Sequence, residues 1–332
     1  MYALSPYPPY LSVPRLTIVR PGEDAGFRRA RAGSGFRYLD AEGAAVTGAD
    51  AERARALVIP PAWTDVWISA DAFGHIQATG IDDAGRRQYI YHPQWSARRD
   101  KGKYARALAL AEALPRARAR VTTSLRRPDL DQERVLAAAF RLLDSAAPRV
   151  GSETYLSKHG SRGLTTLRRR DALVDGAVTS LDFPGKSGKR QNLHIDDADL
   201  AAAIELLAAG RPASPLLAYR RGRRRVPLTP KDVNVYVRSM TGGKFTAKDF
   251  RTLRGTILAA DALARIGLVD TKTDLKRAEV LAVKAAAEAL GNTPTVARGS
   301  YIDPRVFSRY RRGDLLDTAI SPESAIRALL LG

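Results

Sequence analysis

The stretch Leu290-Gly291-Asn292-Thr293-Pro294, followed by Arg298-Gly299-Ser300-Tyr301-Ile302, is the most informative part of this sequence for its fold. It comes after a helical pattern over 276–290, and glycine is the residue that most often ends a helix in a left-handed conformation. We therefore expect a polar turn that closes the helix, with a positive φ at Gly291. A tyrosine lies nine residues after Asn292. On its own, this pattern indicates only a capped helix and an aromatic side chain.

The composition indicates a negatively charged partner. The chain has 54 Lys and Arg against 35 Asp and Glu, a formal net charge of +19 over 332 residues. A surplus of this size favours a polyanion such as nucleic acid. A membrane is the weaker alternative, because no apolar run approaches the roughly 20 residues that span a bilayer, and the N-terminus lacks the features of a signal peptide. We therefore expect a cytoplasmic, nucleoid-associated protein.

The rare residue types exclude several kinds of chemistry. The chain has no cysteine, which rules out disulfides, thiolate metal sites and a thiol nucleophile. Its four histidines, at 75, 92, 159 and 194, do not have the spacings of paired metal ligands, so no metal site is expected. A Gly-x-x-x-x-Gly-Lys-Ser phosphate loop that ends at Ser187 would need a glycine at Ser180. We therefore expect no dependence on ATP.

The sequence divides into two parts with different patterns. Residues 1–96 predict a small β-rich domain, and residues 97–332 predict a larger, mainly helical one. In the first part, strands are expected at 35–40, 66–69, 75–80 and 87–91, with a short helix at 51–57.

Helices dominate the second part, together with a small antiparallel sheet. Its strands are expected at 163–167, 177–183 and 191–195, with Lys186 in the turn before the last one. The arginine-rich stretch 220–225 is expected to be an exposed loop. Helices are expected at 131–145, 197–208, 230–238, 246–265 and 276–290, with a short one after Pro304.

Five side chains have the chemistry needed to break a phosphodiester bond by in-line attack. Such an attack requires a positioned nucleophile, stabilised charge on the non-bridging oxygens, and a proton for the departing 5′ oxygen. The planar guanidinium groups of Arg149 and Arg251 suit the oxygens. Lys186 at a hairpin tip is a mobile donor, and Asn292 offers a neutral N–H donor. Tyr301 supplies an oxygen nucleophile, and its covalent bond to phosphorus would conserve the energy for resealing the strand.

With these residues, the chain resembles the type IB DNA topoisomerases, in the compact branch found in bacteria and poxviruses. The resemblance extends over nearly the whole chain: Lys248-Asp249-Phe250-Arg251 resembles the Lys-Asp-x-Arg box of the family, and the stretches 59–68, 74–80 and 85–92 also match. It implies an α+β fold, in which a β-rich N-terminal domain and a mainly α-helical catalytic domain with a small antiparallel sheet form a clamp around duplex DNA. It also implies an active site made of Arg149, Lys186, Arg251, Asn292 and Tyr301.

The resemblance places further residues against DNA. Gln88, Tyr89 and Tyr91 match positions where the N-terminal domain of the family contacts bases and backbone, and Tyr155 matches another such position. Lys248, from the Lys-Asp-x-Arg box, is expected to bind DNA as well. The basic run over 98–127 is expected to contact the DNA backbone. Its expected contacts include Arg98, Arg99, Lys101 and Lys103.

The activity implied by the resemblance is the relaxation of positive and negative supercoils by a monomer, without metal, ATP or another cofactor. Tyr301 attacks one strand and leaves a 3′-phosphotyrosyl bond and a free 5′-hydroxyl. The duplex rotates about the intact strand, and the hydroxyl then attacks back. Poxvirus members carry histidine where this chain has Asn292. Because asparagine donates only a neutral hydrogen bond, proton donation to the 5′ oxygen is expected to fall more heavily on Lys186 and Arg149.

Two other functions remain open on the sequence. A tyrosine site-specific recombinase shares the Arg-Lys-Arg-Tyr constellation. However, recombinases usually carry His-x-x-Arg where this chain has Lys248 before Arg251, and their N-terminal domain is typically helical. A non-catalytic DNA-binding protein that relies on charge alone would make the five-residue constellation accidental.

Overall fold

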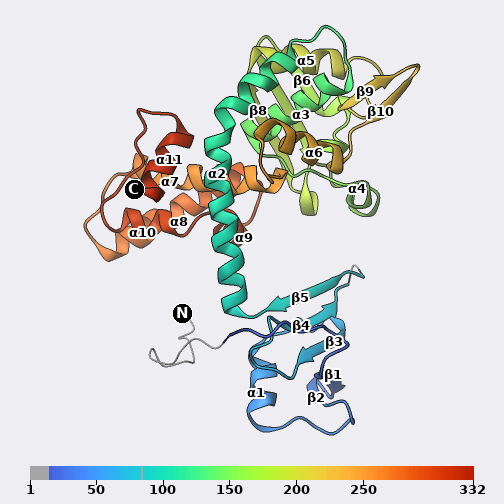
Figure 1. Ribbon diagram of the computed structural model, residues 1–332, viewed down its shortest axis with the longest axis vertical. Helices are drawn as coiled ribbons and strands as arrows, with labels where there is room; N and C mark the ends of the chain where they lie inside the picture. The colour runs from blue at the N-terminus through green and yellow to red at the C-terminus, as the bar shows by residue number, and fades with distance from the viewer. Residues whose placement is uncertain (1–14, 84) are drawn as a thin grey trace. The chain divides into compact units, whose positions relative to one another are not determined.

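The chain folds into two compact units, shown in the computed structural model of Figure 1, which describes residues 15–83 and 85–332. The side chains of Tyr155, His159 and Ser187 lie outside that description. The first unit ends at Gly102 and the second runs from Lys103 to Gly332, so the division falls within helix α2 (Pro93–Leu125). Across the described residues, no helix is both long enough and apolar enough to span a membrane.

The first unit is built on a five-stranded antiparallel sheet with the strand order β2-β1-β3-β4-β5. Ile68 of β3 and Ala78 of β4 are fully buried, and they pack in one cluster with Ala54 of helix α1 (Gly48–Ala56). This sheet fits the β-rich N-terminal part that the sequence predicts. The strand bounds are β1 (Gly26–Ala32), β2 (Gly35–Leu39), β3 (Thr64–Ser69), β4 (Ile76–Ile81) and β5 (Arg87–Tyr91).

The second unit consists mainly of helices, with a three-stranded antiparallel sheet and a separate hairpin. The sheet contains β6 (Ala172–Asp175), β7 (Val178–Pro184) and β8 (Arg190–Asp196), and the hairpin contains β9 (Ala218–Arg221) and β10 (Arg224–Pro227). The helices after α2 are α3 (Gln132–Ala146), α4 (Glu153–His159), α5 (Ala198–Ala208), α6 (Pro230–Thr241), α7 (Ala247–Ile266), α8 (Lys272–Ala289), α9 (Pro294–Ser300), α10 (Arg305–Tyr310) and α11 (Pro322–Leu331).

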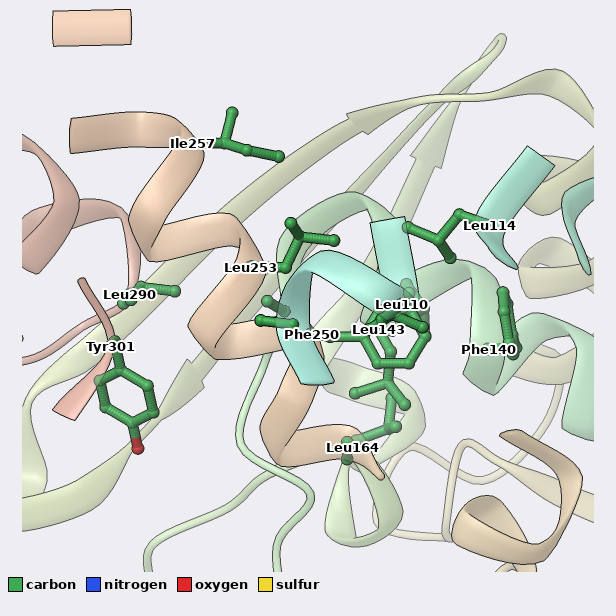
Figure 2. Packing of buried hydrophobic residues seen from close by; sticks show 14 of the residues in the cluster. Leu110, Leu114, Phe140, Leu143, Leu164, Phe250, Leu253, Ile257, Leu290 and Tyr301 are labelled. Carbon is green, nitrogen blue, oxygen red and sulfur yellow. The ribbon is translucent and has the colours of Figure 1, made fainter. Parts of the chain in front are cut away.

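One large apolar core holds the second unit together (Figure 2). Phe140 of α3 meets Phe250 of α7 edge to face, with ring centroids 5.3 Å apart, a favourable arrangement for aromatic pairs. Figure 2 shows Tyr301 at the edge of this core beside Leu290, with its hydroxyl oxygen directed away from the buried side chains. The core therefore fixes both helix α7 and the segment that carries Tyr301.

The predicted helices are present with slightly different ends, but the predicted strand at 163–167 is wrong. Leu164–Thr166 form a short 3-10 turn, and the third strand of the sheet is β6. The Thr165 hydroxyl donates to the Val150 carbonyl at 3.0 Å, and the Thr166 hydroxyl donates to the Gly163 carbonyl at 3.1 Å. The Leu164 and Thr165 N–H groups also donate to the Arg149 and Val150 carbonyls, so the turn after α3 holds the backbone of this segment.

The predicted loop at 220–225 is also wrong, because these residues form the β9–β10 hairpin. Its strands are joined by Gly222-Arg223, with Gly222 at φ 61°, and a positive φ is what a two-residue hairpin turn requires. Exposed arginines on both strands conceal the apolar alternation by which a strand is normally identified. Helix α9 also escaped prediction, since it has only seven residues and ends in Arg298-Gly299-Ser300, which shows no apolar period.

Candidate active site

Side chains from separate elements of the second unit meet around a cavity of about 310 Å³. Arg149, Lys186, Arg251 and Tyr301, four of the five predicted catalytic residues, line it together with Lys248. The structure thus brings together residues that are widely separated in the sequence. The other lining residues are Val150, Gly151, Ser152, Ser161, Arg162 and Ala247.

Arg149 follows helix α3 and is held by backbone contacts. Ala147 ends that helix in a left-handed conformation, with φ 47°. The Leu164 N–H donates to the Arg149 carbonyl at 2.8 Å. This contact requires glycine at 163, because a Cβ on Gly163 would lie 2.5 Å from the Arg149 carbonyl oxygen. The turn at Leu164–Thr166, where the sequence predicts a strand, therefore supports the backbone of a predicted catalytic residue.

Lys248 and Arg251 lie on the first turns of helix α7, which a capping box starts. The Thr246 N–H donates to Asp249 Oδ2 at 2.8 Å, which satisfies a group that the helix itself leaves without a partner. Asp249 is in turn 3.5 Å from the Arg106 guanidinium of α2. The Thr-x-x-Asp spacing therefore determines where α7 begins, and it places Lys248 and Arg251 one turn apart.

The buried guanidinium of Arg251 joins the ends of two helices. One terminal nitrogen donates to the Ala147 carbonyl after α3 at 2.6 Å, and the other donates to the Leu290 carbonyl after α8 at 2.8 Å. Burial lowers the pKa of this group, an effect that Tyr301 opposes and Arg149 reinforces. Arg251 is thus both a structural link and the cation that lies against the tyrosine.

Tyr301 follows helix α9 and has a fixed backbone. Its N–H donates to the Ala297 carbonyl at 2.9 Å. The Thr256 hydroxyl of α7 lies 3.3 Å from the Tyr301 carbonyl and accepts from the Asp303 N–H at 3.1 Å. Gly255 permits this close approach, because a Cβ there would lie 2.8 Å from the Tyr301 carbonyl oxygen.

The Tyr301 phenol lies among cations. The Arg251 guanidinium is 4.8 Å from the centre of its ring, and Arg149, Lys186 and Lys248 line the same cavity. Burial by itself raises the pKa of the phenol, but Arg251, then Arg149 and Lys248, together hold the pKa below its ordinary value. Positive charge near a phenol stabilises the phenolate, so this environment favours the nucleophilic form of the side chain.

Asn292 is not among the residues that line the cavity, but it contacts Arg149, which is. Gly291 ends helix α8 at φ 59°, as predicted, and the Asn292 N–H donates to the Ala287 carbonyl at 2.8 Å. The buried Asn292 Oδ1 accepts a hydrogen bond from Arg149. An arginine can only donate, so this contact leaves the donor Nδ2 as the free end of the amide. Nδ2 is buried and has no hydrogen-bond partner among the described residues.

Lys186 lies at the tip of the hairpin that joins β7 to β8. The Gly185 N–H donates to the Lys189 carbonyl at 2.9 Å and closes the turn. The Lys186 side chain is exposed and lines the cavity, whereas Lys189 lines a neighbouring cavity together with Asn292. Of the two lysines in this turn, Lys186 is therefore the one that shares a cavity with Tyr301.

Arg162 lines the cavity but is not among the site residues that the sequence predicts. Its Nε lies 2.8 Å from Oδ2 of the buried Asp171, and buried Ser161 precedes it. In a chain with so many arginines, no spacing singles out Arg162. The one available signal was its position directly before Gly163, in the turn that supports Arg149.

Tyr89 and Tyr91 lie side by side on strand β5 of the first unit. Their rings are stacked with centroids 5.9 Å apart, and the Arg99 guanidinium lies 5.0 Å from the centre of the Tyr91 ring. Gln88 belongs to the opposite face, because side chains alternate along a strand, and it donates to Asp82 at 2.7 Å. The structure therefore gathers Tyr89, Tyr91 and Arg99 on one surface and separates Gln88 from them.

The other predicted DNA contacts have different environments. Arg98 and Lys101 are exposed on α2. Lys103 is buried, with its ammonium 3.5 Å from the Gly299 carbonyl and 4.3 Å from the centre of the Tyr104 ring. Tyr155 lies on α4, but its side chain is outside the described residues. All of these DNA contacts stay predictions.

Known proteins resemble this chain over most of its length. The family model described as "Eukaryotic DNA topoisomerase I, catalytic core" matches residues 92–311, and the one described as "Bacterial DNA topoisomerase IB, N-terminal domain" matches residues 35–82. The chain is also 28% identical over 325 residues to a protein of Acanthamoeba polyphaga mimivirus named DNA topoisomerase 1B. That alignment covers 92% of this chain and 97% of the viral protein. The first match spans every residue of the candidate site.

Proposed function

The chain belongs to the type IB DNA topoisomerases, isomerases that act on DNA, and we propose that Tyr301 is the nucleophile with which it cleaves one strand of the duplex. The observation that carries this proposal is the phenol of Tyr301 in a cavity lined by Arg149, Lys186, Lys248 and Arg251. A phenol has to lose its proton to attack phosphorus, and these cations lower the cost of that loss.

In the proposed cleavage step, the Tyr301 oxygen forms a bond to phosphorus as the bond from phosphorus to the 5′ oxygen breaks. The phenol proton leaves to solvent, and Lys186 gives a proton to the departing oxygen. The products are a 3′-phosphotyrosyl bond and a 5′-hydroxyl. Because the new bond is a phosphodiester like the old one, the reverse attack reseals the strand after rotation without ATP.

Arg149 and Arg251 stabilise the negative charge on the non-bridging oxygens during this step. Charge-assisted hydrogen bonds to such oxygens are the strong ones, and a preorganised donor needs no reorganisation when the charge develops. Arg251 is held by two backbone carbonyls, and each of its terminal nitrogens retains a second N–H. These fixed arginines supply the charge that a metal ion would provide in other phosphoryl-transfer enzymes.

Asn292 donates from Nδ2 to a phosphoryl oxygen in the transition state. The contact with Arg149 supports this role, since it occupies Oδ1 and leaves a buried donor without a partner among the described residues. Asn292 has no proton to transfer at neutral pH. We therefore assign the proton for the 5′ oxygen to Lys186, whose exposed side chain lines the same cavity as Tyr301.

The partner of both units is duplex DNA, which they enclose as a clamp, and the enzyme acts as a nucleoid-associated monomer. The stacked Tyr89 and Tyr91, with Arg99, provide an aromatic and basic surface of the kind that contacts nucleic acids. The exposed Arg98 and Lys101 add phosphate contacts. A site-specific recombinase is not favoured, because the first unit is a sheet and not a helical domain.

The Tyr301→Phe variant tests the proposed nucleophile. It removes one oxygen and keeps the ring that packs against Arg251. We expect it to lose relaxation of supercoiled plasmid, measured in a buffer with chelator and without ATP, while its affinity for duplex DNA stays close to that of the wild type. A variant that still relaxes plasmid would show that another group carries out the attack.

A further inference from the structure

Glu279 of helix α8 is a buried carboxylate that the proposed cleavage step does not use. Its side chain is 7% exposed and pairs with two arginines. One carboxylate oxygen lies 3.1 Å from Arg298 Nη2, and the other lies 2.5 Å from Arg311 Nη2. We refer to Glu279, Arg298 and Arg311 as the Glu279 bridge.

The two arginines of the Glu279 bridge lie on either side of Tyr301 in the chain. Arg298 is in α9, three residues before Tyr301, and Arg311 caps α10, ten residues after it. The bridge therefore attaches both flanks of the tyrosine to a single point on α8. The Arg298 guanidinium also lies 4.6 Å from the centre of the Phe307 ring in α10, which ties the two flanks to each other.

Helix α8 is itself connected to the cavity. At its end, the Leu290 carbonyl accepts from Arg251 at 2.8 Å, and Asn292 follows two residues later. A shift of α9 or α10 along α8 would therefore move Tyr301 relative to Arg251 and Asn292. The contact with Thr256 restrains the backbone at Tyr301 itself, whereas the Glu279 bridge restrains the two helices that flank it.

We propose that Glu279 is a positioning residue, which aligns Tyr301 for attack on the DNA phosphate by holding α9 and α10 against α8. The inference rests on the proposed role of Tyr301 as the nucleophile. Only the carboxylate is buried, whereas the Arg298 and Arg311 side chains are 39% and 50% exposed, so loss of the Glu279 charge releases both arginines to solvent. In-line attack depends on alignment, and a displacement of about 1 Å can slow a reaction by about a hundredfold.

The Glu279→Gln variant of the full chain tests this role, because it keeps the shape of the side chain and removes its charge. The readouts are the single-turnover cleavage rate at saturating enzyme, the enzyme concentration that gives half of that rate, and the dissociation constant for duplex DNA. We expect the rate at saturation to fall at least about tenfold, with the other two values unchanged.

Glu323→Gln is the matched control for the loss of an ion-paired carboxylate. Glu323 lies on α11 and pairs with Arg118 at 2.5 Å, and among the described residues this ion pair does not involve the flanks of Tyr301. We expect both variants to lower the midpoint of thermal unfolding. Glu323→Gln should nevertheless cleave DNA at the wild-type rate. Equal slowing of cleavage in the two variants would assign the effect of Glu279 to stability alone.

Arg298→Gln and Arg311→Gln repeat the test from the other side of the bridge, and they carry it if Glu279→Gln does not fold. Each should slow cleavage, and the double variant Glu279→Gln/Arg311→Gln should be no slower than Glu279→Gln, because the contact between these two side chains is lost only once. Folded variants that cleave at the wild-type rate would overturn the proposal. So would folded variants whose affinity for DNA falls by the same factor as their cleavage rate. Tyr301→Phe, assayed in parallel, separates the two claims: if it cleaves DNA, the proposed nucleophile is wrong, and if it alone is inactive, only the positioning role fails.

Discussion

Replacement of Gly255 by alanine tests whether the close approach of helix α7 to Tyr301 controls the rate of DNA cleavage. The added Cβ would lie 2.8 Å from the Tyr301 carbonyl oxygen, 3.1 Å from Tyr301 Cβ and 3.0 Å from Leu290 Cδ1. The nearest of these atoms is a backbone oxygen, which cannot rotate away as the end of a flexible side chain can. Helix α7 and the segment that carries Tyr301 therefore have to separate by a few tenths of an ångström.

Two effects of this substitution on stability oppose each other. Alanine in the interior of a helix is more favourable than glycine by about 1 kcal/mol, whereas overpacking of a well-filled core costs about 1–3 kcal/mol. The free energy of unfolding should therefore fall by roughly 0–2 kcal/mol, and the variant should remain folded. The cleavage rate should respond more strongly, falling roughly tenfold or more, because reactivity depends steeply on the position of the attacking atom.

The assay is single-turnover cleavage of a duplex at saturating enzyme, with the dissociation constant of the same duplex measured separately. Gly299→Ala is the matched control: it lies two residues before Tyr301, and a Cβ there has no atom within 4 Å among the described residues. We expect this control to cleave at the wild-type rate. If folded Gly255→Ala also cleaves at that rate, the contact between α7 and the tyrosine backbone does not position the nucleophile.

Four further predictions concern the chemistry and the DNA partner. Asn292→Asp keeps an oxygen for Arg149 but removes the Nδ2 donor, so single-turnover cleavage should slow by about 10²–10³-fold at nearly constant DNA affinity; an unchanged rate would contradict the donor role. Lys248→Gln removes a charge that helps to lower the pKa of Tyr301, so that pKa rises and the ascending limb of the cleavage rate against pH should move to higher pH, whereas a limb that stays in place would refute the coupling. Lys186→Ala should slow cleavage of ordinary DNA but not of a duplex with sulfur in place of the bridging 5′ oxygen, since a thiolate leaves without a proton; equal slowing on both substrates would rule out Lys186 as the acid. The logarithm of the affinity for duplex DNA should fall with the logarithm of salt concentration by about 0.9 per phosphate contact, and a flat response in a titration from low to high salt would contradict the clamp.

Local patterns were enough to predict helices α3, α5, α6, α7 and α8 and the cap at Gly291, but not the full extent of the longest helix, α2. Asp131 caps α3 by accepting from the Arg134 N–H, and Gly291 has the positive φ that the turn requires. Both features depend on residues that are close in the sequence. Arg149, Lys186, Arg251 and Tyr301 were predicted to act together because phosphoryl transfer needs their residue types and because the chain resembles a known family. The structure places them in one cavity, and their catalytic roles stay predictions.

Contacts between distant segments could not be predicted in this way. Nothing near Arg251 in the sequence indicates that its guanidinium bonds to the carbonyls of Ala147 and Leu290. The need for glycine at 255 arises only when Tyr301 packs on α7. The turn at Leu164–Thr166 has the β-branched residues of a strand, but its threonine side chains bond to nearby carbonyls. Each case depends on which segments meet in the fold, and a one-dimensional pattern does not contain that information.

The most direct test of the central claim is to trap the covalent complex and identify the residue and the DNA end that it joins. The substrate is a short duplex in which the fragment beyond the break dissociates, so that the strand cannot be resealed. After proteolysis, mass spectrometry of the DNA-linked peptide should place the modification on Tyr301, and DNA labelled at its 5′ end should stay attached to the protein, as a 3′-phosphotyrosyl bond requires. A modification on another residue, or retention of the 3′-labelled fragment instead, would contradict the proposed mechanism.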